Sequence, residues 1–158
     1  MRDVQFRSDS EIEKYYAIIQ PQFLVALAVT PDGQVLLVKQ YRPAIQRFSL
    51  ELPAGILEEE EDPSQAIARE IQEETGYLCQ SIEPLGEGAT CSSRIDNRTL
   101  SFFVEVGERI PNFVEEPGIS VSSVTLSELR GLILSGDFAE QTHLGVITLA
   151  RCRGLIAF

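Results

Sequence analysis

The pattern of apolar and polar residues predicts that strands dominate the first two thirds of the chain. Two apolar runs rich in β-forming residues, FLVALAVT and VLLVKQYR, flank the turn signals of PDGQ. Such a pair predicts a hairpin of residues 23–30 and 35–42. A further strand follows in FSLELPAG and ends at Pro53, because proline cannot donate to a sheet ladder.

Strand-like and helix-like segments alternate through the rest of the chain. The pattern predicts a strand at 81–87, a loop at 88–97, a strand at 99–106, an acidic loop at 107–118, a strand at 119–124, and closing helices within 126–136 and 139–153. The first 20 residues read as a short polar leader. Strands interrupted by helices predict an α/β fold with a mixed β-sheet, in a single domain of residues 1–158.

Residues 62–76 carry the clearest helix signals in the chain. Asp62 suits the N-cap, Pro63 suits the first helical position, and Gln65 stands where a capping-box partner belongs. Gly76 can supply a left-handed C-cap. The sequence therefore predicts a helix between these two ends.

This helix carries a cluster of carboxylates beside its apolar stripe. Glu70, Glu73 and Glu74 are spaced i, i+3 and i+4, so they share one face, next to the stripe that includes Ile67 and Ile71. Crowded like charges destabilise a helix by roughly 0.2–0.5 kcal/mol per pair. Mg²⁺ prefers carboxylate oxygens and commonly joins a protein to phosphate oxygens, so a bound cation would turn this cost into a gain.

Two other interpretations of the acidic residues stay open at this point. Surface helices are often acid-rich, and the run EEEED at 58–62 is typical of a solvated surface, with Glu61 as the exception. A purely structural or cation-buffering helix would also explain the charge. It would not explain Gly55, Arg69 and Gly76 at their spacings.

The composition is that of an ordinary globular protein, with 44% apolar and 23% charged residues. A net charge of −11 without a compensating basic patch argues against nucleic acid or an anionic membrane as a partner. The three cysteines have no C-x-x-C spacing, so they predict neither a zinc site nor a disulfide framework. The polar N-terminus and the absence of an apolar run long enough to cross a bilayer predict a soluble protein. The cysteines, without a disulfide framework, predict a reducing compartment, the cytoplasm.

The helix and the loop before it form the pattern G-x5-E-x7-R-E-U-x-E-E-x-G-U, where U is a bulky apolar residue. Its members are Gly55, Glu61, Arg69, Glu70, Ile71, Glu73, Glu74, Gly76 and Tyr77. From ordinary residue frequencies, its seven strictly fixed letters would recur by chance in such a chain on the order of once in 10⁵. The pattern resembles the signature of the Nudix hydrolases. Tyr77 is a mild departure, because the last position is usually aliphatic.

The resemblance extends beyond the signature and covers roughly residues 22–150. The stretches VKQYRPAIQRFSLELPAGILEEEEDP and LSGDFAEQTHLGVITLA are similar to the ADP-ribose pyrophosphatase branch of that family. The resemblance implies a Nudix-type α/β/α sandwich, a homodimer, and hydrolysis of a nucleoside diphosphate linked to another moiety, such as ADP-ribose or a related NDP-sugar. The alternative is a Nudix-fold module that binds a nucleotide without cleaving it, and the complete glutamate set argues against that alternative.

The resemblance also implies roles for residues of the signature. It makes Glu70 and Glu74 the principal ligands of Mg²⁺, with Mn²⁺ as the alternative metal. Glu73 would be a further ligand or would hold the attacking water, and the backbone carbonyl of Ala54 would complete the metal site. Arg69 would orient the glutamates. Arg69, Glu73 and Glu74 therefore count as candidate catalytic residues.

Hydrolysis also needs a general base, and the resemblance places it on the loop after the long strand. Glu115 and Glu116 lie in the matching stretch NFVEEPG. The alternative is that both are ordinary loop acids. Pro117 stands where the branch often has a further acid, so the sequence leaves the general base unassigned.

Four residues outside the signature are candidate substrate contacts. Arg42, at a strand end, suits either a phosphate or ribose contact or a surface salt bridge. Glu51 suits either a substrate contact or pairing with an arginine. Arg94 and Arg98 lie in SSRIDNR, where specialists for ADP-ribose typically carry a Pro-Gly turn. His143, the only histidine, is expected to pack or to form a hydrogen bond in the last helix.

Overall fold

The computed structural model of the protein describes residues 2–7 and 12–158. Along the chain, its elements are β1 (Arg2–Arg7), β2 (Ile12–Ile19), β3 (Phe23–Val29), β4 (Val35–Arg42), the 3₁₀ turn η1 (Pro43–Ile45), β5 (Arg47–Glu51), β6 (Ala54–Ile56), α1 (Pro63–Thr75), β7 (Tyr77–Gly88), β8 (Ile95–Asp96), β9 (Thr99–Arg109), β10 (Ile119–Val124), α2 (Leu126–Ser135) and α3 (Gln141–Cys152). Within these described ranges, no helix combines the length and the apolar character needed to cross a membrane.

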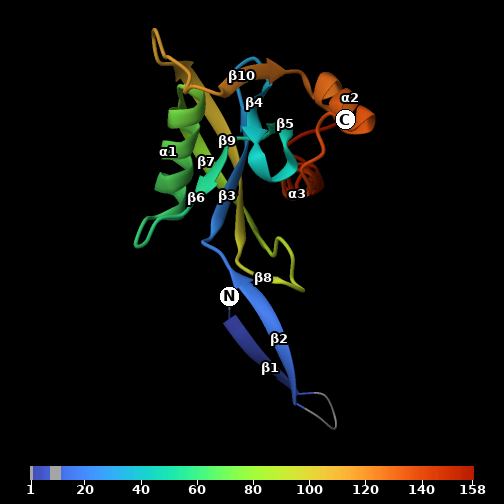
Figure 1. Cartoon of the computed structure of the whole chain (residues 1–158). Helices are drawn as coiled ribbons and strands as arrows, with labels where there is room; N and C mark the ends of the chain where they lie inside the picture. Colours follow the sequence, from blue (N-terminus) through green and yellow to red (C-terminus); the bar gives the residue numbers. More distant parts are fainter. Residues whose placement is uncertain (1, 8–11) are drawn as a thin grey trace.

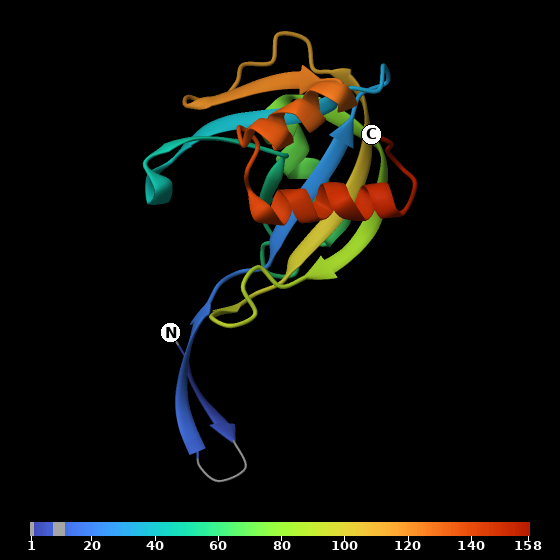
Figure 2. The same ribbon diagram turned by 90° about the vertical axis from the view of Figure 1, so that its right-hand side faces the viewer.

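A mixed sheet forms the centre of the fold (Figure 1). Its strands run in the order β10-β4-β3-β9-β7, with β5 paired to β4 and β6 paired to β3. The β3–β9 pair is parallel, and the other pairs of this sheet are antiparallel. Helix α1 covers one face, whereas α2 and α3 cover the other (Figures 1 and 2). The predicted α/β/α sandwich with a mixed sheet is confirmed.

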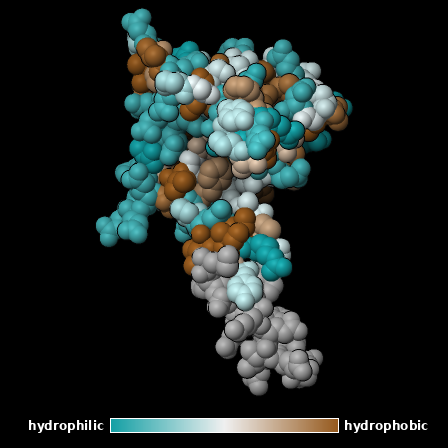
Figure 3. Space-filling model, in the orientation of Figure 1, coloured by the Kyte–Doolittle hydropathy of each residue, from teal (hydrophilic) through white to brown (hydrophobic). Residues whose placement is uncertain are grey.

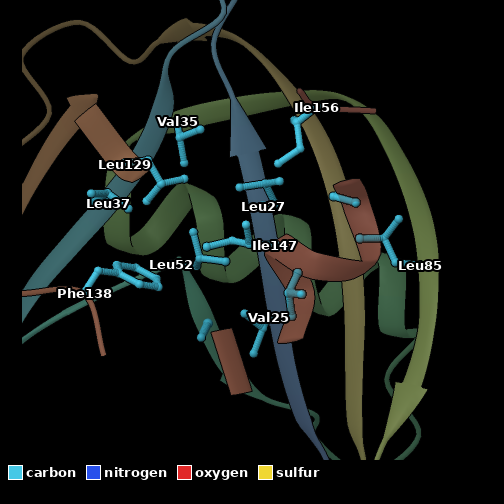
Figure 4. Packing of buried hydrophobic residues seen from close by; sticks show 13 residues of the cluster. Val25, Leu27, Val35, Leu37, Leu52, Leu85, Leu129, Phe138, Ile147 and Ile156 are labelled. Carbon is cyan, nitrogen blue, oxygen red and sulfur yellow. The ribbon is translucent and has the colours of Figure 1, made fainter. Parts of the chain in front are cut away.

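The burial of strand β3 explains why its sequence is apolar without alternation. Val25 and Leu27 pack in the cluster that includes α2 and α3 (Figure 4), whereas Leu24 and Ala26 pack in the cluster that includes α1. All four side chains are 0% exposed. A strand that is covered on both faces reads as a continuous apolar run. The sheet therefore gives α1 a rigid support.

Strands β3 and β4 pair at Val29 and Val35, beside their turn, and then take different partners. Strand β4 continues with β5, whereas β3 continues with β6. The predicted single strand in FSLELPAG is therefore two short strands on opposite sides of an opening. The break comes at Pro53, which cannot continue a ladder, and the chain crosses the opening between Glu51 and Ala54.

Helix α1 begins and ends where its caps predict. The Asp62 carboxylate accepts hydrogen bonds from the backbone N–H groups of Ser64 and Gln65 at 2.9 and 3.1 Å. Gly76 ends the helix in the left-handed conformation, with φ 74°. The side chains that α1 buries are those of Ala66, Ile67, Ile71 and Thr75.

Most of the first 20 residues lie in two strands, which the sequence analysis did not predict. Strands β1 and β2 form an antiparallel hairpin that extends away from the main sheet (Figure 1). Strand β2 also pairs in parallel with β8 through Ile18 and Ile19. The aromatic and β-branched residues of IEKYYAII favour a strand, but the charged residues among them hide this signal. The part of the prediction that concerns residues 1 and 8–11 lies outside the described residues.

Three other boundaries differ from the sequence prediction. Strand β7 is longer than the predicted 81–87. Register shifts against β9 interrupt the alternation of its apolar and polar side chains, so the sequence pattern did not indicate the full length of the strand. The predicted loop at 88–97 contains β8, whose pairing with β2 depends on residues far away in the chain. Strand β9 continues to Arg109, so the acidic loop begins after that residue.

Gly76→Ala should destabilise the fold more than the matched control Gly136→Ala. Both glycines end a helix with positive φ, at 74° and 82°, and an L-residue in that conformation costs about 1–2 kcal/mol. A Cβ at Gly76 would also lie 2.3 Å from the Phe113 ring, whereas a Cβ at Gly136 meets no described atom within 4 Å.

We expect Gly76→Ala to lower the free energy of unfolding by about 1–3 kcal/mol more than the control does. Urea unfolding of the two variants measures the difference. Equal losses would contradict the close approach of Phe113.

Candidate functional site

The candidate site is centred on the contact between the backbone of Ala54 and Gly55 and the carboxylates of α1. The N–H of Ala54 donates to Oε2 of Glu74 at 3.1 Å. A Cβ on Gly55 would lie 2.0 Å from Cδ of Glu70, so any other residue there would displace this carboxylate. Gly55 is therefore needed for the close approach of backbone and side chain.

Burial changes the electrostatics of these two carboxylates. Desolvation raises the pKa of Glu74 to about 8, although the hydrogen bond from Ala54 acts in the opposite direction. Desolvation also raises the pKa of Glu70, and the bond from Arg69 opposes this shift. Burial disfavours the charged form of a carboxyl, and a nearby cation favours it. Both carboxylates would therefore gain from a bound divalent cation.

Arg69 connects the carboxylates of the signature to one another. Its Nε and Nη2 donate to the two oxygens of Glu61 at 3.0 and 3.1 Å, in a bidentate pair. Its Nη1 donates to Glu70 at 2.8 Å and to Glu73 at 3.2 Å. The arginine thereby holds the loop before α1 and two helical glutamates together. The surface over α1 and this loop is hydrophilic (Figure 3).

The donor set of α1 fits a hard divalent cation in its chemistry. Within the described ranges, no three histidine, cysteine, aspartate or glutamate side chains converge in a preformed metal-binding group. Glu70 and Glu73 are held by Arg69, whereas Glu74 is held by the N–H of Ala54. Carboxylates from one helical turn are nevertheless the oxygen donors that Mg²⁺ and related cations prefer. Their burial against a glycine-containing backbone adds to that fit.

Arg42 and Glu51, two of the candidate substrate contacts, form an ion pair across β4 and β5. Nε of Arg42 donates to Oε1 of Glu51 at 2.9 Å, and Nη2 donates to Oε2 at 2.5 Å. Burial opposes ionisation of Glu51, but its hydrogen bonds outweigh this effect, and the pKa of the carboxyl lies below its usual value. The side chains are 40% exposed for Arg42 and 4% for Glu51. The structure therefore favours pairing with an arginine as the role of Glu51.

His143 connects α3 to the segment that leads into the site. Its Nδ1 accepts a hydrogen bond from the N–H of Leu52 at 2.9 Å, across 91 positions of sequence. The imidazole is 1% exposed and stacks on the ring of Phe23. Burial lowers the pKa of this group. The sequence predicted packing or a hydrogen bond but not this partner, and the only available signal was that the chain has a single histidine.

Arg94 and Arg98 lie near the start of β8 and of β9. Nη1 of Arg98 donates to Oε1 of Glu87 on β7 at 3.0 Å. The carbonyl of Arg94 accepts a hydrogen bond from the N–H of Ile18 at 2.8 Å, which ties this turn to β2. A substrate contact by either arginine stays a prediction.

The loop after β9 brings Glu115 and Glu116 toward the C-terminal end of α1. The N–H of Ile110 donates to the carbonyl of Gly76 at 2.8 Å, so the loop starts beside the end of the helix. Glu115 accepts a hydrogen bond from Arg109 at 3.0 Å. A role for either acid as the general base stays a prediction.

Comparison with known proteins identifies relatives over most of the chain. A family model described as the NUDIX domain matches residues 20–142. An ADP-ribose pyrophosphatase of Bacillus subtilis (strain 168) is 31% identical over 132 residues, which cover 82% of this chain and 71% of the relative. A methanol dehydrogenase activator of Bacillus methanolicus is 30% identical over 124 residues, which cover 76% of this chain and 66% of the relative.

Solved structures share the fold. A crystal structure of an ADP compounds hydrolase superposes with a TM-score of 0.77, covering 94% of this chain and 81% of the other. At 20% sequence identity, this likeness concerns the fold alone.

Arg42→Met should destabilise the fold, because it leaves the buried Glu51 carboxylate without its partner. We expect a loss of about 1–3 kcal/mol in the free energy of unfolding near neutral pH. The double variant Arg42→Met/Glu51→Gln should recover most of that loss, because the buried group is then neutral.

Urea unfolding of these two variants and of Glu51→Gln completes the cycle. If the double variant were no more stable than Arg42→Met, the charge of Glu51 would not be what Arg42 stabilises.

Proposed function

This chain belongs to the Nudix hydrolase family, and on that basis we propose that it uses Mg²⁺ to cleave the diphosphate of ADP-ribose or a related NDP-sugar. Members of this family are pyrophosphohydrolases that use divalent metal ions and act on small nucleoside diphosphate compounds. The observation that carries the proposal is the contact of the Ala54 and Gly55 backbone with Glu70 and Glu74. This contact brings the start of the family signature against two glutamates of its helix.

The chemistry of the substrate class is supported by the relatives and by charge. The relative from Bacillus subtilis is an ADP-ribose pyrophosphatase. A chain with net charge −11 binds a diphosphate only where a metal ion or a local arginine offsets its field. Arg42 fits a hydrogen-bond contact to a phosphate or the ribose, because Glu51 orients its guanidinium while 40% of the side chain stays exposed. Contacts by Arg94 and Arg98 belong to the same proposal.

Glu70, Glu73 and Glu74, with the carbonyl of Ala54, would hold the metal. A divalent cation bound there lowers the pKa of a bound water and neutralises phosphate oxygens. Arg69 keeps two of these carboxylates in place through the bonds described above. Gly55 allows them to lie against the backbone.

The reaction itself requires one proton acceptor in addition. A water attacks one phosphorus, the bond from that phosphorus to the bridging oxygen breaks, and two phosphate monoesters form. The carboxylate of Glu115 or Glu116 would accept the proton of the attacking water. General-base assistance of this kind contributes roughly 10²–10⁴-fold to a rate.

A homodimer is part of the proposal and is supported by exposed apolar residues where the hairpin joins the body (Figure 3). Ile18, Ile19 and Ile56 are 48%, 55% and 53% exposed there. The net charge of −11 supports partners that are neither nucleic acid nor anionic membrane. Three free thiols, on Cys79, Cys91 and Cys152, support a reducing compartment such as the cytoplasm.

Wild-type protein should release phosphate from ADP-ribose when Mg²⁺ is present and a phosphatase is coupled to the reaction. A panel of other NDP-sugars, dinucleoside polyphosphates, NADH and coenzyme A measures the specificity under the same conditions. Activity should disappear when a chelator removes the metal and return when Mg²⁺ or Mn²⁺ is added. If the protein cleaved another panel member instead, that compound and not ADP-ribose would be its preferred substrate. Absence of turnover on every member would contradict the proposal.

Glu74→Gln should lower turnover by roughly 10³-fold or more, because a metal ligand would be replaced by a neutral amide. The fold should stay intact, because the amide oxygen of glutamine can still accept the hydrogen bond from Ala54. Glu59→Gln, in the exposed acidic run, is the matched control and should keep wild-type activity. Circular dichroism and urea unfolding verify that both variants fold. Near-wild-type turnover of Glu74→Gln would disprove the metal-site assignment.

A further inference from the structure

Arg109 fastens the loop that carries Glu115 to the C-terminal end of α1. Its Nε donates to the carbonyl of Thr75, the last residue of the helix, at 3.0 Å. Its Nη2 donates to Oε1 of Glu115 at 3.0 Å. Thr75 directly follows Glu74 in the chain. One guanidinium thus joins the helix of the candidate metal ligands to a candidate general base.

Two aromatic rings hold this guanidinium in place. It lies 5.8 Å from the ring centroid of Tyr77 and 5.4 Å from that of Phe113. Arg109 and Tyr77 are also direct partners in the ladder of β7 and β9. An arginine over an aromatic face gains a cation–π interaction that an aliphatic residue would not provide. Tyr77, the mild departure from the family signature, therefore has a specific partner in this chain.

The base of the loop is also attached through its backbone. The N–H of Ile110 donates to the carbonyl of Gly76 at 2.8 Å, and the N–H of Phe113 donates to the carbonyl of Ile110 at 3.2 Å. The Phe113 ring lies so close to Gly76 that a Cβ there would be 2.3 Å away. The first residues of the loop therefore have a defined position beside the helix even without the side chain of Arg109.

We propose that Arg109 is a positioning residue for catalysis, and that it acts by holding Glu115 as the loop acid that serves the reaction. The proposal rests on the proposed function. The side chains of Arg109 and Glu115 are 39% and 32% exposed, and an ion pair this exposed orients a carboxylate more than it stabilises the fold. Arg109 bonds to one oxygen, Oε1, and a carboxylate has a second oxygen with which to accept a proton.

A merely structural arginine and a positioning arginine differ in a double-mutant cycle on turnover. Arg109→Met should lower kcat about 10-fold with little change in KM, and Glu115→Gln should lower it about 10²-fold or more. If Arg109 acts through Glu115, the double variant should be no slower than Glu115→Gln alone. Arg109→Lys should recover part of kcat, since lysine keeps the charge but loses the planar fork.

Glu116→Gln provides the competing arm of the cycle. The loss of kcat caused by Arg109→Met should be the same in the Glu116→Gln background as in wild type, because Arg109 does not act through Glu116. If the double variant lost kcat by the product of the two single-variant losses, the proposal would be overturned. Wild-type activity in Glu115→Gln would overturn it too. A loss of the Arg109 effect in the Glu116→Gln background would overturn it as well.

Arg153 offers a matched control elsewhere in the fold. It also bonds to one carboxylate, that of Glu83, and to backbone carbonyls, those of Pro84 and Leu85. Arg153→Met should leave kcat unchanged. If it lowered kcat as much as Arg109→Met does, the loss would not depend on the bond to Glu115, and the proposal would be overturned.

Amide hydrogen exchange gives a second readout that does not depend on activity. The N–H groups of Ile110 and Phe113 should exchange faster in Arg109→Met than in wild type or in Arg153→Met. Unchanged exchange would overturn the attachment of the loop by Arg109. Absence of turnover in wild-type protein would instead overturn the proposed function, while the exchange result would still decide whether Arg109 holds the loop.

Discussion

The close contact between the backbone of Gly55 and the carboxylate of Glu70 is the constraint on which the rest of the site depends. It requires a residue without a Cβ, since a Cβ would lie 2.0 Å from Cδ of Glu70. It also requires α1 to hold a fixed position on the sheet, which the burial of Ile67 and Ile71 provides. Strands β3 and β4 separate beyond their turn, so the chain can pass from β5, which pairs with β4, to β6, which pairs with β3 and contains Gly55. Core packing and the positions of the carboxylates are therefore parts of one arrangement.

The fold tolerates three carboxylates on one helical turn because positive charge is built in around them. Arg69 joins two of them to the loop before the helix, and Arg42 neutralises Glu51 on the other side of the opening. Glu74 differs, because the donor bonded to it is the neutral N–H of Ala54 and burial raises its pKa to about 8. A divalent cation, which this family uses, would supply the charge that this carboxyl needs.

Side chains outside the signature hold the segments that carry it. His143 reaches from α3 to the N–H of Leu52, two residues before Ala54. Arg109 reaches from β9 to the carbonyl of Thr75, one residue after Glu74. Both act on the backbone next to the site, His143 from a helix that covers the sheet and Arg109 from a strand within it. The family signature accounts for the carboxylates of α1, and these contacts hold the backbone segments that lie next to them.

The sequence by itself determined α1, its caps and the face that carries its carboxylates, because capping and i, i+4 spacing are local properties of the chain. It also determined the buried strands β3 and β4, whose apolar runs are bounded by turn signals. Only the tertiary structure decided the N-terminal hairpin, the partner of His143 across 91 positions and the bond of Arg109 to Thr75 across 34 positions. Each of these contacts joins segments that are brought side by side only when the whole sheet and its helices have packed. The periodicity of a single segment carries no information on which other segment it will meet.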